Sequence, residues 1–304
     1  MPDMDILEPS MQAFTTSPSP INLTAGRPIS KLKIGTVALQ AGATAPTLAE
    51  FLGRISELYV KATVRGKSQD LIRFENGNDL WAFNMLCPWI LHRPYCQISG
   101  ADNENVNILG LEVPLGLPSG KHSGIYQLGI EVTDIATTDV EKLSVAEVYG
   151  PLAFPNLPGA LVKGKVFKTY KRLYTPNATG PNEGFDIGED GDLIGLLCWQ
   201  TTYPKVDLST SDPTAVSIKE FILKVGGVDR IHLDLPTYYF GQNKTAIVAV
   251  SDGTTLVETD ELQKYFFVDV VNMIGAINCR GKAVKFRTNA GVADAIRVYP
   301  IYLI

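Results

Sequence analysis

The sequence predicts an all-β protein made of two roughly eight-stranded jelly-roll sandwiches in tandem, with a few short helices. Three observations lead to this prediction. Apolar and polar residues alternate in many short segments, which is the pattern of strands with one buried and one wetter face. Turn-forming residues separate those segments. A stretch rich in proline and glycine divides the chain into two halves of similar length and similar strand content.

The predicted domain boundaries follow from where the strand patterns begin and stop. Residues 1–29 are expected to form an N-terminal arm, because proline and serine take the place of a periodic apolar face there. Residues 30–149 then make the first jelly roll. Residues 150–159 are the predicted linker, since proline cannot donate to a strand ladder. Residues 160–304 make the second jelly roll.

Composition supports a folded chain with two domains. The 304 residues are 45% hydrophobic and 19% charged, and a chain of this length buries a sizeable core without disulfide or metal staples. The formal net charge is −5, which argues against a protein that wraps nucleic acid. We therefore expect no sequence-specific nucleic acid among the partners.

Regular alternation predicts individual strands at several places. Residues 130–132, 231–235 and 284–288 each place apolar side chains two positions apart, with polar residues between them. Successive side chains of a strand point to opposite faces, so one face of each segment is expected to be buried. The last strand is expected at residues 295–304, after the turn residues 289–291.

Two turn sequences predict hairpins. Asn76-Gly77 lies between the apolar runs Leu71–Phe74 and Leu80–Phe83, and Asn-Gly accepts the positive φ angles of a tight turn. Residues 251–254 predict a second hairpin in the same way.

Helix is expected to be scarce. Thr47 and Glu50 have the spacing of a capping box, and apolar residues then recur at helical spacing, which predicts a helix beginning at Thr47. The later part of this segment, Leu58–Val64, is β-branched enough to form a strand instead. Two shorter helix candidates lie at residues 214–223 and 259–264.

The sequence carries no recognisable catalytic motif, so no enzyme is expected. There is no Gly-x-Ser-x-Gly elbow, and only three histidines are available as bases. Cys87, His92 and Cys96 lie close together but lack the ligand pairs of a zinc site. We therefore expect no cofactor, with calcium as the one candidate.

The calcium candidate is an acidic segment beside flexible glycines. Asp186, Glu189, Asp190 and Asp192 concentrate four carboxylates, and a hard cation such as calcium takes oxygen ligands. The EF-hand pattern is not met, because Gly188 occupies its third position. An exposed acidic loop is the alternative interpretation.

A basic cluster begins the second half of the chain. Lys163, Lys165, Lys168, Lys171 and Arg172 fall within a short segment without an acidic residue. We expect Lys163 and Lys165 to share one face of a strand. Such a cluster suits an anionic surface, such as lipid headgroups, nucleic acid or the carboxylates of another subunit. The alternative is a solvated strand edge, where lysine discourages aggregation.

On these features the chain resembles the double jelly-roll major capsid proteins of tailless icosahedral viruses with an internal membrane, the lineage that includes the adenovirus hexon. The features are the joint at residues 150–159, the strand-rich segments on both sides, the short helices at 47–55 and 259–264, and the N-terminal arm.

The resemblance implies a viral structural protein of the virion capsid, synthesised in the host cytoplasm. It implies homotrimers with a pseudo-hexagonal outline, which tile an icosahedral shell together with neighbouring capsomers and other capsid proteins. It also implies that the basic cluster faces the internal viral membrane or another subunit.

A different class of function stays open beside this one. A carbohydrate- or receptor-binding β-sandwich protein, such as a spike or a lectin, would have exposed aromatic residues on a concave face. Tyr238, Tyr239 and Phe240 form the one aromatic cluster that suggests it.

Overall fold

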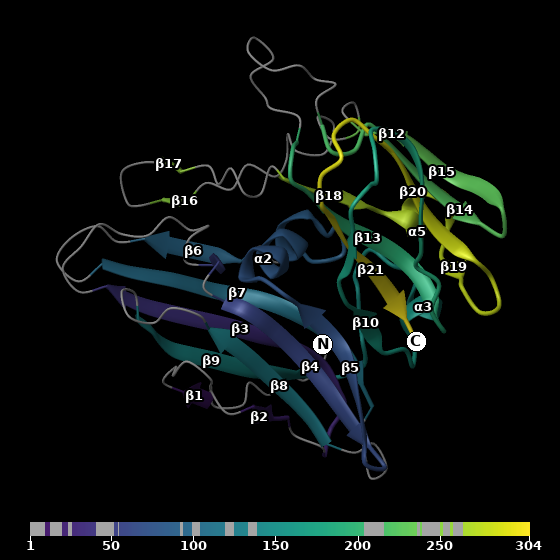
Figure 1. Ribbon diagram of the computed structural model, residues 1–304. Coiled ribbons are helices and arrows are strands. Elements are labelled where there is room, and N and C mark those ends of the chain that lie inside the picture. The colour runs from purple at the N-terminus through teal and green to yellow at the C-terminus, as the bar shows by residue number, and fades with distance from the viewer. Residues whose placement is uncertain are drawn as a thin grey trace. The chain divides into compact units, whose positions relative to one another are not determined.

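The computed structural model describes residues 10–12, 20–23, 26–40, 52–53, 55–91, 94–98, 104–118, 125–132, 139–203, 216–235, 238, 250–251, 256–257 and 264–304. Strands dominate these ranges, and the helices among them are short. The chain forms two compact units. Unit 1 comprises residues 1–170 and 248–259, and unit 2 comprises residues 171–247 and 260–304. The predicted all-β class with sandwiches in tandem is confirmed (Figure 1).

The strands of unit 1 lie in two sheets. The first holds, in spatial order, β1 (Ser10–Gln12), β9 (Asp139–Tyr149), β3 (Ile29–Gln40), β7 (Glu104–Leu117), β6 (Tyr95–Ile98), β16 (Val250–Ser251) and β17 (Leu256–Val257). The second holds β10 (Phe167–Thr169), β5 (Lys67–Phe74), β4 (Ile55–Val64), β8 (Ile125–Val132) and β2 (Ile21–Asn22). β3 is central in the first sheet, because Ile34 pairs with Leu111 of β7 on one side and Val145 of β9 on the other.

The core of unit 1 lies between the inward faces of its strands. Leu58 and Val60 on β4 and Ile72 on β5 are buried, as the two-residue period of a strand requires. A helix, α2 (Gly77–Leu86), adds aromatic side chains to this core. The ring of Phe83 lies 5.6 Å from that of Phe74, between centroids.

The hairpin predicted at Asn76-Gly77 is wrong, because this dipeptide begins α2. The Asn76 side chain accepts a hydrogen bond from the backbone N–H of Asn78 and so acts as the helix N-cap. Gly77 is required by close packing, since a Cβ there would lie 2.4 Å from the backbone oxygen of Leu52. The same residues suit a turn or a cap, and tertiary packing selects the cap.

The helix predicted from Thr47 falls mostly outside the described residues, although Leu52 and Gly53 are helical. Its later part is the strand β4, which was the alternative for Leu58–Val64. β4 pairs antiparallel with β5 and with β8, and these ladders satisfy its backbone on both edges.

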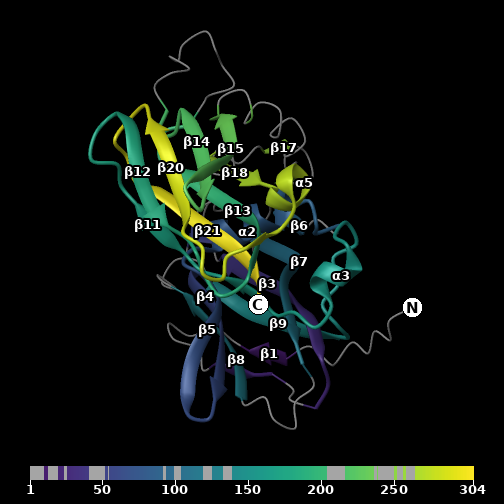
Figure 2. The ribbon, with the colours of Figure 1, turned by 90° about the vertical axis from the view of Figure 1, so that its right-hand side faces the viewer.

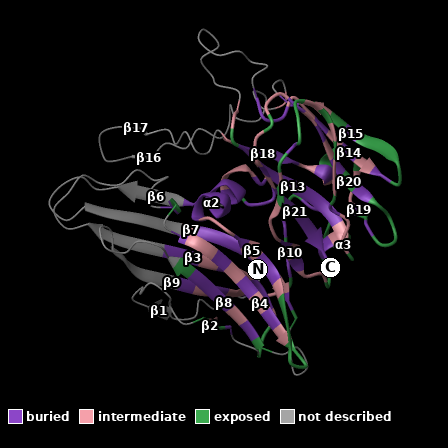
Figure 3. Ribbon diagram, viewed as in Figure 1, coloured by how far each residue is buried: buried purple, intermediate pink, exposed green. Residues whose placement is uncertain are grey.

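The strands of unit 2 also lie in two sheets. One has β13 (Asp192–Gln200) between β18 (Tyr265–Val268) and β21 (Ile296–Leu303), with β19 (Ile277–Asn278) also on β13 and β11 (Arg172–Tyr174) on β21. Figure 2 shows the other, in the order β12 (Gly180–Asp186), β20 (Val284–Ala290), β14 (Glu220–Val225) and β15 (Val228–Asp234). Residues 193–198 of β13 are all buried, so both faces of this strand are covered (Figure 3).

Two predicted strands of unit 2 are confirmed, and one predicted helix is wrong. β20 and β21 lie where the alternation at 284–288 and the final segment 295–304 placed them. The sequence predicts a helix at 214–223. From Glu220 onward this segment instead forms the strand β14, in which buried and half-buried residues alternate. Lys264 is the described residue of the helix predicted at 259–264, and the rest lies outside the described residues.

A helix that the sequence did not predict, α5 (Val270–Ile274), follows β18. The Asp269 side chain accepts a hydrogen bond from the backbone N–H of Asn272 and caps it. The hairpin predicted at 251–254 is flanked by β16 and β17, which pair antiparallel. Its turn residues lie outside the described residues.

The compact units divide between Tyr170 and Lys171, later than the predicted linker at 150–159. Residues 150–158 contain neither strand nor helix, as their prolines imply. Their apolar members Leu152, Phe154 and Leu157 are nevertheless buried, which holds this segment against unit 1. The jelly-roll boundaries 30–149 and 160–304 stay predictions.

Two described pieces of the predicted N-terminal arm belong to sheets. β1 pairs antiparallel with β9, and β2 pairs antiparallel with β8. The side chains of β1 lie outside the description.

Candidate functional site

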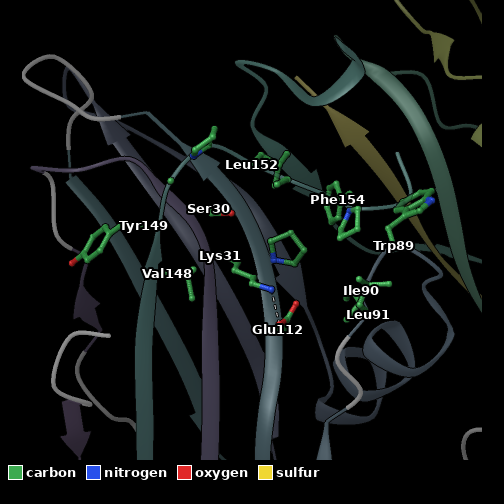
Figure 4. Close-up of a pocket in the computed structure, with 15 residues that line it drawn as sticks. Ser30, Lys31, Trp89, Ile90, Leu91, Glu112, Val148, Tyr149, Leu152 and Phe154 are labelled. Atoms are coloured by element: carbon green, nitrogen blue, oxygen red, sulfur yellow. Dashed lines mark hydrogen bonds and ion pairs between the residues drawn. The ribbon is translucent and has the colours of Figure 1, made fainter. Parts of the chain in front are cut away.

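A cavity of about 260 Å³ opens in unit 1 beside the segment 150–155. Its wall is mostly apolar and comes from the start of β3, the middle of β7, the end of β9 and the residues that follow α2. Figure 4 shows these residues, which are Ser30, Lys31, Trp89, Ile90, Leu91, Glu112, Pro114, Val148, Tyr149, Gly150, Pro151, Leu152, Ala153, Phe154 and Pro155.

Aromatic packing forms one side of this cavity. The rings of Trp89 and Phe154 lie 5.9 Å apart, and Phe154 lies 6.0 Å from Phe167 on β10. The predicted linker thus contributes a side chain to an aromatic cluster that continues to Phe83 on α2, 5.8 Å from Phe167. Contacts of this kind stabilise the fold beyond the burial of apolar area alone.

The polar part of the wall is an ion pair. The Nζ atom of Lys31 lies 2.6 Å from Oε1 of Glu112 (Figure 4), and Nζ of Lys33 lies 3.9 Å from the same oxygen. The side chain of Glu112 is only 5% exposed. A buried carboxylate needs such partners, because burial without them costs several kcal/mol.

A second carboxylate near this cavity is also satisfied. The Tyr149 hydroxyl donates a hydrogen bond of 2.7 Å to Glu147, and the guanidinium of Arg27 lies 5.4 Å from the centre of the Tyr149 ring. The residues that line the cavity hold no histidine or cysteine to activate a nucleophile.

The structure brings three of the four calcium candidates together. Asp186, Glu189 and Asp190 line an open depression in unit 2, with Lys282 beside them. Asp192 is the first residue of β13, where its Oδ1 accepts a hydrogen bond of 2.9 Å from the Asn278 amide.

The contacts of these carboxylates favour an acidic loop. Oδ1 of Asp186 accepts a hydrogen bond of 2.7 Å from the backbone N–H of Gly188, and Glu189 lies 3.5 Å from the guanidinium of Arg172. Within the described ranges no group of three or more His, Cys, Asp or Glu side chains is placed to hold a metal ion. Calcium binding stays a prediction, for which the readout is a rise in Tm on adding calcium.

The basic cluster does not form one strand face. Lys163 follows a short helix, α3 (Gly159–Val162), and its backbone N–H donates to the carbonyl of Gly159. Residues 163–166 are irregular, so the strand expected for Lys163 and Lys165 is wrong. A positive φ of 70° at Gly164 turns the chain out of the helix instead.

The later members of the cluster have partners of their own. Lys168 on β10 lies over the ring of Tyr170, with its Nζ 5.4 Å from the ring centre. Arg172 on β11 makes the ion pair with Glu189 described above. Lys171 and Arg172 belong to unit 2, whereas the first three lysines belong to unit 1.

Of the aromatic cluster at 238–240, the structure describes Tyr238. It is half-buried, and its hydroxyl donates a hydrogen bond of 2.8 Å to the carbonyl of Phe267 on β18. Tyr239 and Phe240 lie outside the described residues. None of the described helices is long and apolar enough to cross a membrane.

Comparison with known proteins gives no match by sequence and a clear match by fold. No family model and no curated protein matches the chain. The structure of the STIV major capsid protein is 11% identical with a TM-score of 0.66, and the alignment covers 98% of this chain and 97% of that one.

Two further structures agree with this match. A chain from the atomic structure of Sulfolobus turreted icosahedral virus is 12% identical with a TM-score of 0.69, over 99% of this chain and 90% of that one. A chain from the PBCV-1 virus capsid is 8% identical with a TM-score of 0.52, and the alignment covers 99% of this chain and 93% of that one. From end to end, the chain therefore has the fold of the major capsid proteins of double jelly-roll viruses.

Proposed function

We propose that this protein is the major capsid protein of an icosahedral virus. The observation that carries the proposal is the extent of the similarity in fold, which covers 98% and 99% of the chain in the STIV comparisons. A match to one sandwich alone would be weak support, because sandwiches host many unrelated functions. A match over both units in tandem is far more specific.

The physical character of the chain suits a shell. Each unit is a β-sandwich with a dense apolar core, and rigid sandwiches offer long sides for subunit interfaces and end loops that vary. The cavity beside residues 150–155 is lined by packing residues and a satisfied ion pair. We infer that the role is structural rather than enzymatic and needs no cofactor.

The proposed assembly is a homotrimer with a pseudo-hexagonal outline. Three copies would present six similar sandwiches, which tile flat facets together with neighbouring capsomers and other capsid proteins. The protein would then be located in the virion after synthesis in the host cytoplasm. The basic cluster from Lys163 to Arg172 would contribute to contacts with the internal viral membrane or with a neighbouring subunit.

Light scattering coupled to size-exclusion chromatography tests this assembly directly. We expect particles of three times the monomer mass, and electron micrographs of them should show hexagonal outlines. A protein that stays monomeric at high concentration would contradict the proposal. A monomer that also binds specific sugars on a glycan array would support the carbohydrate-binding alternative instead.

A further inference from the structure

The cavity beside residues 150–155 combines a mostly apolar wall with charge at a single place. Of the 15 described residues that line its volume of about 260 Å³, Lys31 and Glu112 are the charged ones. Figure 4 shows this pair between Val148 on one side and Ile90 and Leu91 on the other. An apolar wall with a few polar groups is the usual form of a site for a small molecule.

The segment beside this cavity is anchored on both sides. The N–H of Gly150 donates a hydrogen bond of 2.8 Å to the carbonyl of Pro28. After Pro155, the Asn156 side chain donates a hydrogen bond of 2.9 Å to the carbonyl of Pro88. The cavity is therefore already formed without a ligand, and a ligand that enters it pays little for ordering the chain.

The cavity opens to solvent among apolar side chains. Leu91 is 55% exposed, and Pro151, Ala153 and Pro155 in the lining segment are exposed as well. A ligand can reach the cavity through this opening, and any apolar part that extends beyond the cavity still contacts apolar surface.

Two ammonium groups face one carboxylate in the cavity. The Nζ atom of Lys31 lies 2.6 Å from Oε1 of Glu112, and the Nζ atom of Lys33 lies 3.9 Å from the same oxygen. The second distance exceeds that of a hydrogen bond, so Glu112 binds one lysine closely and leaves an excess of one positive charge. An ammonium group has three donors, and Lys31 uses one of them on Glu112.

The sequence around the cavity supplies little acid to offset this charge. The segments that contribute to the wall come from stretches without Asp or Glu, namely residues 9–49, 80–101, 113–130 and 148–182. Glu147 lies beside them on β9, but it is buried and accepts the hydrogen bond of Tyr149. The guanidinium of Arg27 lies over that tyrosine ring. The surroundings therefore attract an anion.

This arrangement distinguishes between amphipathic ligands by their charge. A cation would be repelled by the excess lysine, and the carboxylate that it needs is already bound. A neutral molecule would fill the apolar part and leave the excess charge unmatched. A carboxylate can accept hydrogen bonds from the free donors of Lys31 and from the hydroxyl of Ser30, which also lines the cavity. Such bonds to ionised groups are stronger than those between neutral groups.

The volume of the cavity suits a chain of about eight carbons. A water molecule occupies about 30 Å³ in the liquid, so 260 Å³ corresponds to about nine atoms of similar size. Octanoate, an unbranched carboxylate with eight carbons, is close to this size.

We infer that this cavity binds a small amphipathic carboxylate of the medium-chain fatty acid class. The carboxylate binds Lys31 and Lys33, and the alkyl chain lies against Trp89, Leu91 and Phe154. The inference goes beyond the proposed function, because the site lies within one unit of a single subunit and does not depend on assembly.

Calorimetric titration of the full chain with carboxylates of increasing length tests this inference. Octanoate should bind at one site and raise Tm, because it binds the folded state. From butanoate to octanoate the affinity should rise about fourfold for each added methylene that is buried. It should level off at dodecanoate, since the cavity is then full. Octylammonium, which has the same chain and the opposite charge, should not bind.

Matched variants locate the site. Leu91→Ser removes an apolar contact at the opening and should weaken octanoate binding roughly threefold to tenfold. Leu173→Ser on β11 of unit 2 is the control, because Leu173 is 59% exposed, and it should bind octanoate like wild type.

A third variant tests the role of charge. Lys33→Gln keeps the pair of Lys31 and Glu112 and removes the excess charge. It should weaken octanoate binding roughly twofold to fivefold, the range of a partly exposed ion pair, and should leave the weaker binding of octanol unchanged.

Four outcomes would overturn the inference. Octanoate that produces neither a heat of binding nor a rise in Tm would do so, and so would equal binding of octylammonium. An affinity that keeps rising to dodecanoate would indicate adsorption on general apolar surface. Equal weakening by Leu91→Ser and Leu173→Ser would place the binding outside this cavity.

Discussion

Asn84 on α2 makes both backbone hydrogen bonds of Glu112 on β7. Its Oδ1 accepts from the N–H of Glu112 at 2.7 Å, and its Nδ2 donates to the carbonyl of Glu112 at 3.0 Å. β6 pairs with β7 only as far as Leu109, opposite Tyr95. The buried amide therefore takes the place of a neighbouring strand and attaches α2 to the sheet beside the cavity.

Asn84→Leu is expected to destabilise the protein by about 2–4 kcal/mol. The apolar side chain leaves the N–H and carbonyl of Glu112 buried without partners, and each orphaned group costs about 1–3 kcal/mol. Chemical denaturation measures the change. Asn156→Ala is the matched control, because the Asn156 amide donates to the carbonyl of Pro88 at an exposed site and should cost less than about 1 kcal/mol. Similar losses in the two variants would contradict this account of Asn84.

Gly129→Ala on β8 is expected to destabilise unit 1 by about 1–3 kcal/mol through overpacking. A Cβ at Gly129 would lie 2.0 Å from the Tyr59 ring, which is itself held beneath Lys61, whose Nζ is 4.0 Å from the ring centre. Removing the ring in Y59S/G129A should recover part of the loss. Gly26→Ala is the control, because nothing lies within 4 Å of its added Cβ. A neutral Gly129→Ala, measured by thermal unfolding, would refute the close packing.

Glu57 on β4 is expected to make stability fall as pH rises above 4.5. Burial raises the pKa of Glu57 above its ordinary value of 4.5, and Glu131 and Asp70 raise it further, although Arg73 and Lys61 oppose them. Between pH 4.5 and the higher pKa of Glu57 in the folded state, the folded protein still binds a proton that the unfolded chain has released. The free energy of unfolding therefore decreases as the pH rises through this range.

Glu57→Gln should remove that part of the pH dependence. Urea denaturation at a series of pH values on both sides of the ordinary Glu pKa of 4.5 gives the slope of stability against pH for each protein. Steeper loss in the variant than in wild type would show that the sign is wrong.

Three cysteines are expected to be unreactive in the native protein. Cys87, Cys198 and Cys279 are free and buried, and burial raises the pKa of the Cys198 and Cys279 thiols. Since the thiolate is the reactive form, a maleimide should label these residues only after denaturation. Peptide mass spectrometry identifies each site. Rapid native labelling of Cys198 would show that β13 is open to solvent.

The sequence predicts the fold class well because alternation is a local property. β20 shows it clearly, since Val284, Phe286 and Thr288 are buried on one face. Asn76-Gly77 misleads because it suits both a turn and a helix N-terminus, and the choice depends on the distant Leu52. Local patterns carry no information about such a contact.

The cavity was beyond sequence reasoning for a related reason. It depends on strand register, which brings the start of β3 beside the later part of β7 and the end of β9. The basic cluster is visible as composition. The contact of its Lys165 with β7 appears only in the structure, where a Cβ at Gly116 would lie 2.3 Å from the backbone oxygen of Lys165.

Residues 248–259 belong to unit 1 although they follow most of unit 2 in the sequence, and this affects how the chain folds during synthesis. β16 joins β6 through Ser251 and Gln97, and β17 joins β16, so the first sandwich receives its last strands after most of the second has left the ribosome. Until then β6 is an edge strand of the first sheet without a neighbour on its outer side, and such an edge can pair with other nascent chains. Truncation after Tyr170 would make that vulnerable intermediate permanent.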